Sequence, residues 1–223
     1  MAFMPIFGHT SVPVKIRIAF SFFVAVFLYP IVDTQNDFTQ VTFIEGLISE
    51  ITLGLVASFF VNIIFSAVKI IGEFVGYATA LAMANFFDPA SGAQEGIVAK
   101  ILFYISLAVF FESGMYEMTF VILAKSFSMI TLGSFDIFSY NGIEIAMMEI
   151  QRMFAFAFAF AFPLFFIGFI IDIYYGYGTK SMPAFSPFVI TFQLKFALIF
   201  LFMMFGMEVF TQGFTEYFLT KFE

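Results

Sequence analysis

Residues 153–171 form the longest stretch of this sequence without a charged side chain, at 19 residues. An α-helix rises about 1.5 Å per residue, so about 20 apolar residues are enough to cross roughly 30 Å of hydrocarbon. Phe and Ala alternate from Phe154 to Phe162, which on its own is typical of a strand. A lone strand in lipid would leave its backbone groups unpaired. We therefore predict a membrane-spanning helix.

The composition extends this conclusion to the whole chain. Hydrophobic residues make up 62% and charged residues 11%, against about 45–50% and about 25% in soluble domains. A soluble fold of this size could not hide so much apolar surface. We predict an integral membrane protein of a single unit.

The same counts exclude several classes of function. A net charge of −7 without a basic cluster argues against nucleic-acid binding. The absence of cysteine removes disulfides, thiolate metal sites and cysteine nucleophiles. His9 is the only histidine, so a histidine-based metal site or a Ser-His relay has no support. We expect no cofactor, no metal and no enzymatic activity, and the start of the chain does not resemble a cleavable signal peptide.

Other apolar segments are also predicted to be helices. They are residues 15–32, 46–71, 115–132 and 188–210. A polar connector is expected over 133–151, chain breaks at Gly176, Gly178, Pro183 and Pro187, and a short amphipathic tail from Thr211. Lys15 and Arg17 precede the first span, which favours a cytoplasmic start.

Two apolar segments are too short to cross a bilayer comfortably. Residues 72–87 and 97–111 flank the Pro-, Gly- and Ser-containing stretch 88–96. This arrangement predicts a re-entrant hairpin, whose loop survives at membrane depth only if protein buries it or it lines a watery cavity. A plainer interpretation makes Asp88 the N-cap and Pro89 the first residue of the following helix.

Small residues recur every four positions along this part of the chain. The small-residue stripe consists of Gly54, Ser58, Asn62 and Ser66, followed by Gly72, Gly76, Ala80 and Ala84. In the Phe-Ala repeat, Ala155 with Ala159 and Ala157 with Ala161 form similar pairs. Small residues on one face let helix backbones approach closely. The partner could be another helix of this chain or a related subunit around a pore.

Ionisable residues within apolar segments are costly, and they usually face partners or water. They are Glu50, Lys69, Glu73, Asp88, Lys100, Glu112, Asp172, Lys195 and Glu208. Lys69 and Glu73 are four residues apart on one helix face. One hypothesis treats these charges as paired structural groups. Another uses Glu50, Glu73 or Asp172 as a proton relay in an ion- or proton-coupled transporter with broken helices.

Three motifs resemble the FliR/SpaR/YscT family of type III secretion export gates. The central one joins Gly72-Glu73-Phe74-Val75-Gly76 to Phe86-Phe87-Asp88-Pro89-Ala90-Ser91-Gly92-Ala93-Gln94, and is similar to the flagellar branch. The N-terminal one combines Pro5-Ile6-Phe7-Gly8 with Ser11-Val12-Pro13 and Arg17. The C-terminal one combines Pro183, Phe188-Val189-Ile190 and Phe192-Gln193-Leu194-Lys195. Family members usually carry another apolar segment before the first motif, so one N-terminal helix is expected to be missing here.

The resemblance implies an all-α fold of helical hairpins with a re-entrant plug loop at residues 80–95. Residues 1–152 would be a FliP-like part and residues 153–223 a FliQ-like hairpin. The plug residues would be Phe86, Phe87, Asp88, Pro89, Ser91, Gly92 and Gln94.

The resemblance also implies where and with what such a chain works. One copy would join five FliP and four FliQ subunits, near FlhB and rod and other basal-body proteins, in the bacterial inner membrane. The assembly would pass unfolded flagellar subunits. A membrane scaffold without a conducting role remains a further alternative.

Overall fold

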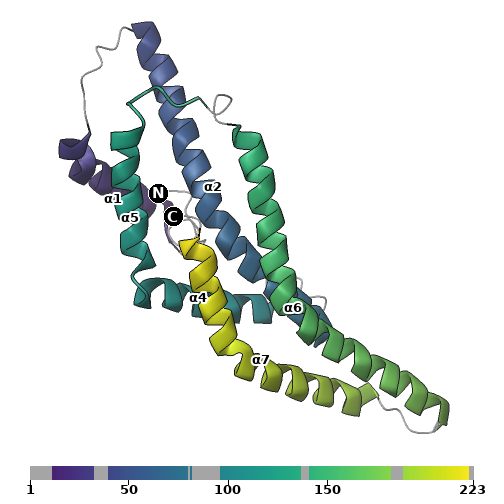
Figure 1. The fold of residues 1–223 in the computed structure, drawn as a ribbon. Coiled ribbons are helices and arrows are strands. Elements are labelled where there is room, and N and C mark those ends of the chain that lie inside the picture. The colour runs from purple at the N-terminus through teal and green to yellow at the C-terminus, as the bar shows by residue number, and fades with distance from the viewer. Residues whose placement is uncertain are drawn as a thin grey trace. The chain divides into compact units, whose positions relative to one another are not determined.

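The described part of the chain is helical throughout. A computed structural model describes residues 12–32, 40–79, 81, 96–136, 141–181 and 188–220. Its elements are α1 (Val14–Leu28), the 3₁₀ turn η1 (Tyr29–Ile31), α2 (Gln40–Ala78), α4 (Ile97–Glu112), α5 (Met115–Met129), α6 (Gly142–Ser181) and α7 (Phe188–Leu219) (Figure 1). These ranges contain no strand, which confirms the all-α prediction and the helical interpretation of the Phe-Ala repeat.

Three helices are long and apolar enough to cross a membrane. They are the segments Phe43–Ala78, Gly142–Lys180 and Thr191–Leu219. A bent pair, α4 and α5, would make a fourth if the two together formed one span. Gly114 separates them with a φ of +74°, a conformation that glycine adopts without the steric cost paid by other residues. The prediction of a membrane protein is therefore supported by length and composition.

Several predicted boundaries were wrong, because the helices continue past the residues at which we expected them to begin or end. α2 continues through Ile71 and Gly72, where we expected two segments. α6 begins at Gly142 inside the expected connector, with Glu144 in its first turn, where the helix dipole favours an acid. It also continues past Gly176 and Gly178, because a glycine inside a helix costs only about 1 kcal/mol. α7 runs on to Leu219, so the expected tail from Thr211 is its last part.

The chain divides into two compact units. The first unit contains α1, the first part of α2, α5 and the start of α6. Within it, the loop after α5 is held by α2. The Ser49 hydroxyl donates to the Phe135 carbonyl at 2.8 Å, and a Glu50 carboxylate oxygen accepts from the Gly133 N–H at 2.8 Å. Glu50 thus binds the backbone of the loop that follows α5.

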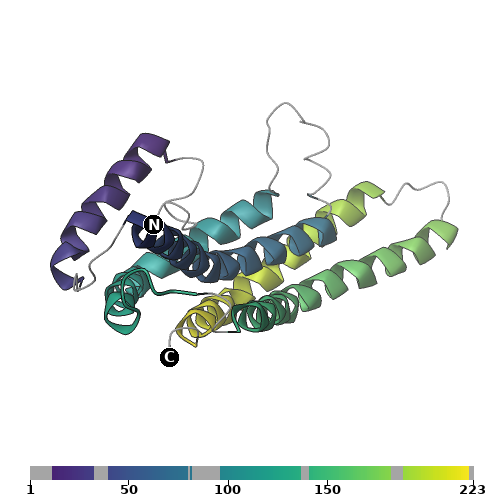
Figure 2. The ribbon, with the colours of Figure 1, turned by 90° about the horizontal axis from the view of Figure 1, so that it is seen from above.

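The second unit contains the end of α2, most of α4, α6 from Arg152 onward, and α7. α6 and α7 form an antiparallel hairpin, and Figure 2 shows them side by side from above. Ring contacts join Phe156 to Tyr217 at 5.0 Å and Phe160 to Phe210 at 5.1 Å. Ala157 and Ala161 are fully buried, whereas Ala155 and Ala159 are exposed. Only one of the two predicted alanine pairs therefore lies on the packed face of α6.

Candidate functional site at the end of helix α2

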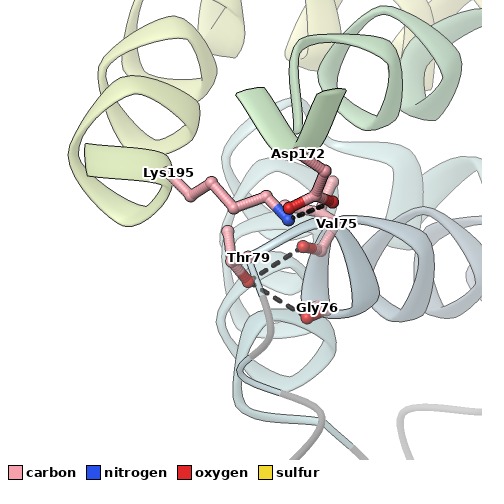
Figure 3. A network of polar contacts seen from close by, with 5 residues as sticks. All are labelled: Val75, Gly76, Thr79, Asp172 and Lys195. Carbon is pink, nitrogen blue, oxygen red and sulfur yellow. Dashed lines mark hydrogen bonds and ion pairs between the residues drawn. The ribbon is translucent and has the colours of Figure 1, made fainter. Parts of the chain in front are cut away.

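The last turn of α2 is closed by its own Thr79. The Thr79 hydroxyl lies within hydrogen-bond distance of the Val75 carbonyl, at 2.9 Å, and of the Gly76 carbonyl, at 3.1 Å (Figure 3). The Thr79 N–H also donates to Val75. The final carbonyls of a helix lack intrahelical partners, and an unpaired buried carbonyl is costly. Thr79 is fully buried, so it satisfies these groups where water cannot.

α4 packs against this part of α2 at a contact that only glycine permits. A Cβ added at Gly72 would lie 2.6 Å from the Ala99 nitrogen and closer still to its Cα. Such distances are far below an ordinary van der Waals contact of about 3.5 Å. One turn earlier, the Lys69 ammonium lies 5.6 Å from the centre of the Phe103 ring. The two helices therefore run antiparallel with their backbones in close approach at Gly72.

Glu73 ties the start of α4 to α2. One carboxylate oxygen of Glu73 accepts the Gly96 N–H at 2.8 Å. Gly96 immediately precedes Ile97, the first residue of α4, so its N–H has no helical acceptor. Glu73 thus binds Gly96, the residue that follows the predicted loop at 80–95. Thr79, the residue that precedes this loop, is bonded to the last turn of α2.

The α6–α7 hairpin covers the end of α2. A Cβ at Gly168 would lie 3.0 Å from the Ala78 carbonyl oxygen and 3.3 Å from Ile199. One turn along each helix, the Lys195 ammonium binds the Asp172 carboxylate at 2.7 Å. Figure 3 shows this ion pair beside the last turn of α2. Helices α2, α6 and α7 therefore meet around Gly168 and the ion pair between Asp172 and Lys195.

The predicted packing residues have unlike surroundings. Gly72 is in tight contact with Ala99, whereas a Cβ at Gly54 or Gly76 would meet no atom within 4 Å. Gly54 is exposed and Gly76 is buried. The Ser58 hydroxyl is buried and donates to the Leu55 carbonyl at 2.8 Å.

The remaining predicted packing and plug residues lie outside the described residues. They are Ala80, Ala84, Phe86, Phe87, Asp88, Pro89, Ser91, Gly92 and Gln94.

The predicted buried charges also differ from one another. Lys195 is buried, and Glu50, Lys69 and Glu73 are half-buried. The expectation for Lys100 was wrong, because it is exposed on the side of α4 away from the buried Ala99 and Leu102. Sequence reasoning also missed Thr79, Gly96 and Gly168. Their only signal was a polar or small residue, at the edge of an apolar run for Thr79 and Gly96 and inside one for Gly168.

The described residues contain no group of three acids or histidines that could hold a metal ion. They do provide hydrogen bonds from side chains to backbone and an ion pair between α6 and α7. This arrangement positions chain segments relative to one another.

Comparison with known proteins gives a consistent result over nearly the whole chain. Residues 1–220 match the family described as bacterial export proteins, family 1. The flagellar biosynthetic protein FliR of Bacillus subtilis is 26% identical over 214 residues, covering 92% of this chain and 81% of that protein. FliR of Escherichia coli is 24% identical, covering 85% and 73%. FliR of Borreliella burgdorferi is 28% identical over a shorter region, 68% of this chain and 57% of that protein.

Proposed function

The chain belongs to the bacterial export proteins, family 1, and from this premise we propose that it is a subunit of the flagellar type III protein export gate. The observation that carries the proposal is the match over residues 1–220, together with relatives from several bacteria that are all named flagellar biosynthetic protein FliR. The three apolar helices long enough to span a membrane fit such a subunit.

The proposal includes the assembly and its place in the cell. One copy of this chain joins five FliP and four FliQ subunits, with FlhB and basal-body proteins nearby, in the bacterial inner membrane. The assembly passes unfolded flagellar subunits, and this chain has no enzymatic role. Exposed apolar side chains on its helices support this placement, because such a surface is stable only against lipid or partner subunits. Phe22, Phe205 and Val209 are each at least about two-thirds exposed.

We further propose that residues 80–95 act as the plug of the closed channel. The tight contact of Gly72 with Ala99 and the bond from Gly96 to Glu73 support this role, because they give the loop a fixed base. The acids also favour a gate over a coupled transporter. Glu50 and Glu73 each accept a backbone N–H, which gives both a structural task.

Co-expression tests the proposed assembly. The full chain is co-expressed with candidate FliP and FliQ proteins of the same bacterium, and the native mass of the purified complex is measured. The expected result is one complex with a single copy of this chain. Transport by the chain alone in proteoliposomes, without any stable complex, would contradict the proposal and support the transporter.

Deletion of residues 90–94 tests the plug. The assembled complex with the deletion is expected to leak ions, as measured by conductance across a planar bilayer. A deletion of equal length in the 33–39 segment serves as a control. Unchanged conductance from a complex of normal mass would remove the plug role while leaving the assembly intact.

A further inference from the structure

The ion pair between Asp172 and Lys195 is unequal in its exposure to solvent. The Lys195 side chain is 9% exposed and the Asp172 side chain is 57% exposed, although their charged atoms are 2.7 Å apart. A buried charge without a partner is strongly unfavourable, whereas a solvated carboxylate is stable by itself. Lys195 therefore depends on Asp172 much more than Asp172 depends on Lys195.

The Phe-Ala repeat of the same hairpin specifies its alignment poorly. Phe and Ala alternate from Phe154 to Phe162, so a slip of four residues replaces Phe160 by Phe156 and Ala161 by Ala157. The slipped hairpin would present the same side chains at positions 158–162, because residues 154–158 would take their places. A single buried polar group can select one alignment among similar apolar ones, as it does in coiled coils.

The ion pair lies where alignment matters for α2. It is one turn from Gly168 and Ile199, and Gly168 approaches Ala78 at the end of α2. Figure 3 shows Lys195 beside Val75 and Thr79. The C-terminal end of a helix carries partial negative charge, so it also favours a nearby cation.

We infer that Lys195 is a positioning residue, which fixes the register of the α6–α7 hairpin against the end of α2, and that Asp172 is the counter-charge that permits its burial. The register is a property of this chain alone. Its consequence for export rests on the proposed function, because the end of α2 is the base of residues 80–95.

Cysteine cross-linking measures the register directly, because the sequence has no cysteine of its own. A Cβ at Gly206 would lie 3.8 Å from the Phe160 ring, so cysteines at 160 and 206 report the native register. After a slip of four residues, position 156 would take the place of position 160. Cysteines at 156 and 206 therefore report the slipped register. A short bifunctional thiol reagent is applied to the full chain in membranes.

The variants separate positioning from simple loss of structure. Asp172→Asn leaves a buried cation without its partner, so the native cross-link is expected to fall at least about tenfold relative to Asp172→Glu, which keeps the charge. Lys195→Met removes the cost of burying a charge and, with it, the preference for the native register, so both cross-links should form. Adding Lys195→Met to Asp172→Asn should restore the native cross-link to the level of Lys195→Met alone.

Two results would overturn the inference: a native cross-link unaffected by Asp172→Asn, or no recovery in the double variant. Secretion of flagellar subunits by the same cells should follow the native cross-link across the series. Secretion unrelated to the cross-link would overturn the link to export. A wild-type chain that never purifies with FliP and FliQ would instead refute the proposed function, and the cross-links would still report the register.

Discussion

The contact between Gly72 and Ala99 makes a quantitative prediction about the packing of α2 on α4. In Gly72→Ala, the new methyl would lie 2.6 Å from the Ala99 nitrogen. The helices must then separate by at least about 1 Å to reach an ordinary contact distance, because the Ala99 Cα is closer still. Overpacking of this kind costs about 1–3 kcal/mol.

A matched control lies on the same helix. A Cβ at Gly54 would meet nothing within 4 Å, so Gly54→Ala gains helix propensity without a clash. Both variants share the propensity gain of about 1 kcal/mol, and their difference isolates the clash. We expect Gly72→Ala to be less stable than Gly54→Ala by about 1–3 kcal/mol, or about 2–12 °C in Tm for a chain of this length.

Thermal unfolding in detergent, followed by circular dichroism, provides the measurement. A second variant tests the cause. Two of the three atoms nearest the new methyl belong to the Ala99 backbone, so Ala99→Gly should recover only a minor part of the loss. Equal Tm values for Gly72→Ala and Gly54→Ala would refute the reasoning. Full recovery by Ala99→Gly would show that only the Ala99 methyl is in contact.

Three further predictions concern single contacts. Glu73→Ala should lose about 1.5–3 kcal/mol of local stability and speed amide hydrogen exchange at Gly96. Glu73→Gln keeps an acceptor and should have a smaller effect. Equal exchange rates at Gly96 in the two variants would contradict the hydrogen bond. Glu50→Ala should speed exchange at Gly133 while leaving Gly96 unchanged, and the reverse pattern would refute the assignment of the two acids. Gly76→Leu should prevent purification of the chain with partner subunits, since a Leu side chain at this buried position forces the neighbouring helix away; normal co-purification would contradict the predicted packing role of Gly76.

The apolar runs of the sequence were sufficient to predict the class of fold and the existence of its helices. Their ends were not predictable from hydropathy, because a helix continues beyond its apolar run wherever its residues permit. Glu144 at the start of α6 and Glu216 near the end of α7 are examples. Gly72 was interpreted as a boundary, although its small size serves the approach of Ala99 in mid-helix.

The contacts of the site were less predictable than the fold. Lys69 and Glu73 are neighbours by helical spacing, but their spacing in the sequence cannot reveal that Glu73 accepts the Gly96 N–H. Asp172 and Lys195 were recognised as charges in apolar surroundings, and their pairing depends on how the hairpin closes. Both contacts join residues 23 positions apart. Such pairs are set by the packing of helices, which no local pattern encodes.

Helix α6 has 40 residues, which corresponds to about 60 Å, or about twice the thickness of the hydrocarbon core. Its excess length is not polar throughout, since Ile143 is 67% exposed near one end and Tyr177 is 77% exposed near the other. A bilayer alone cannot cover both ends by tilting or thickening at a modest cost. Copies of this chain that find no partner subunit should therefore be degraded quickly. Proteolysis in the cell would then keep the amount of this chain equal to the amount that its partner subunits can bind.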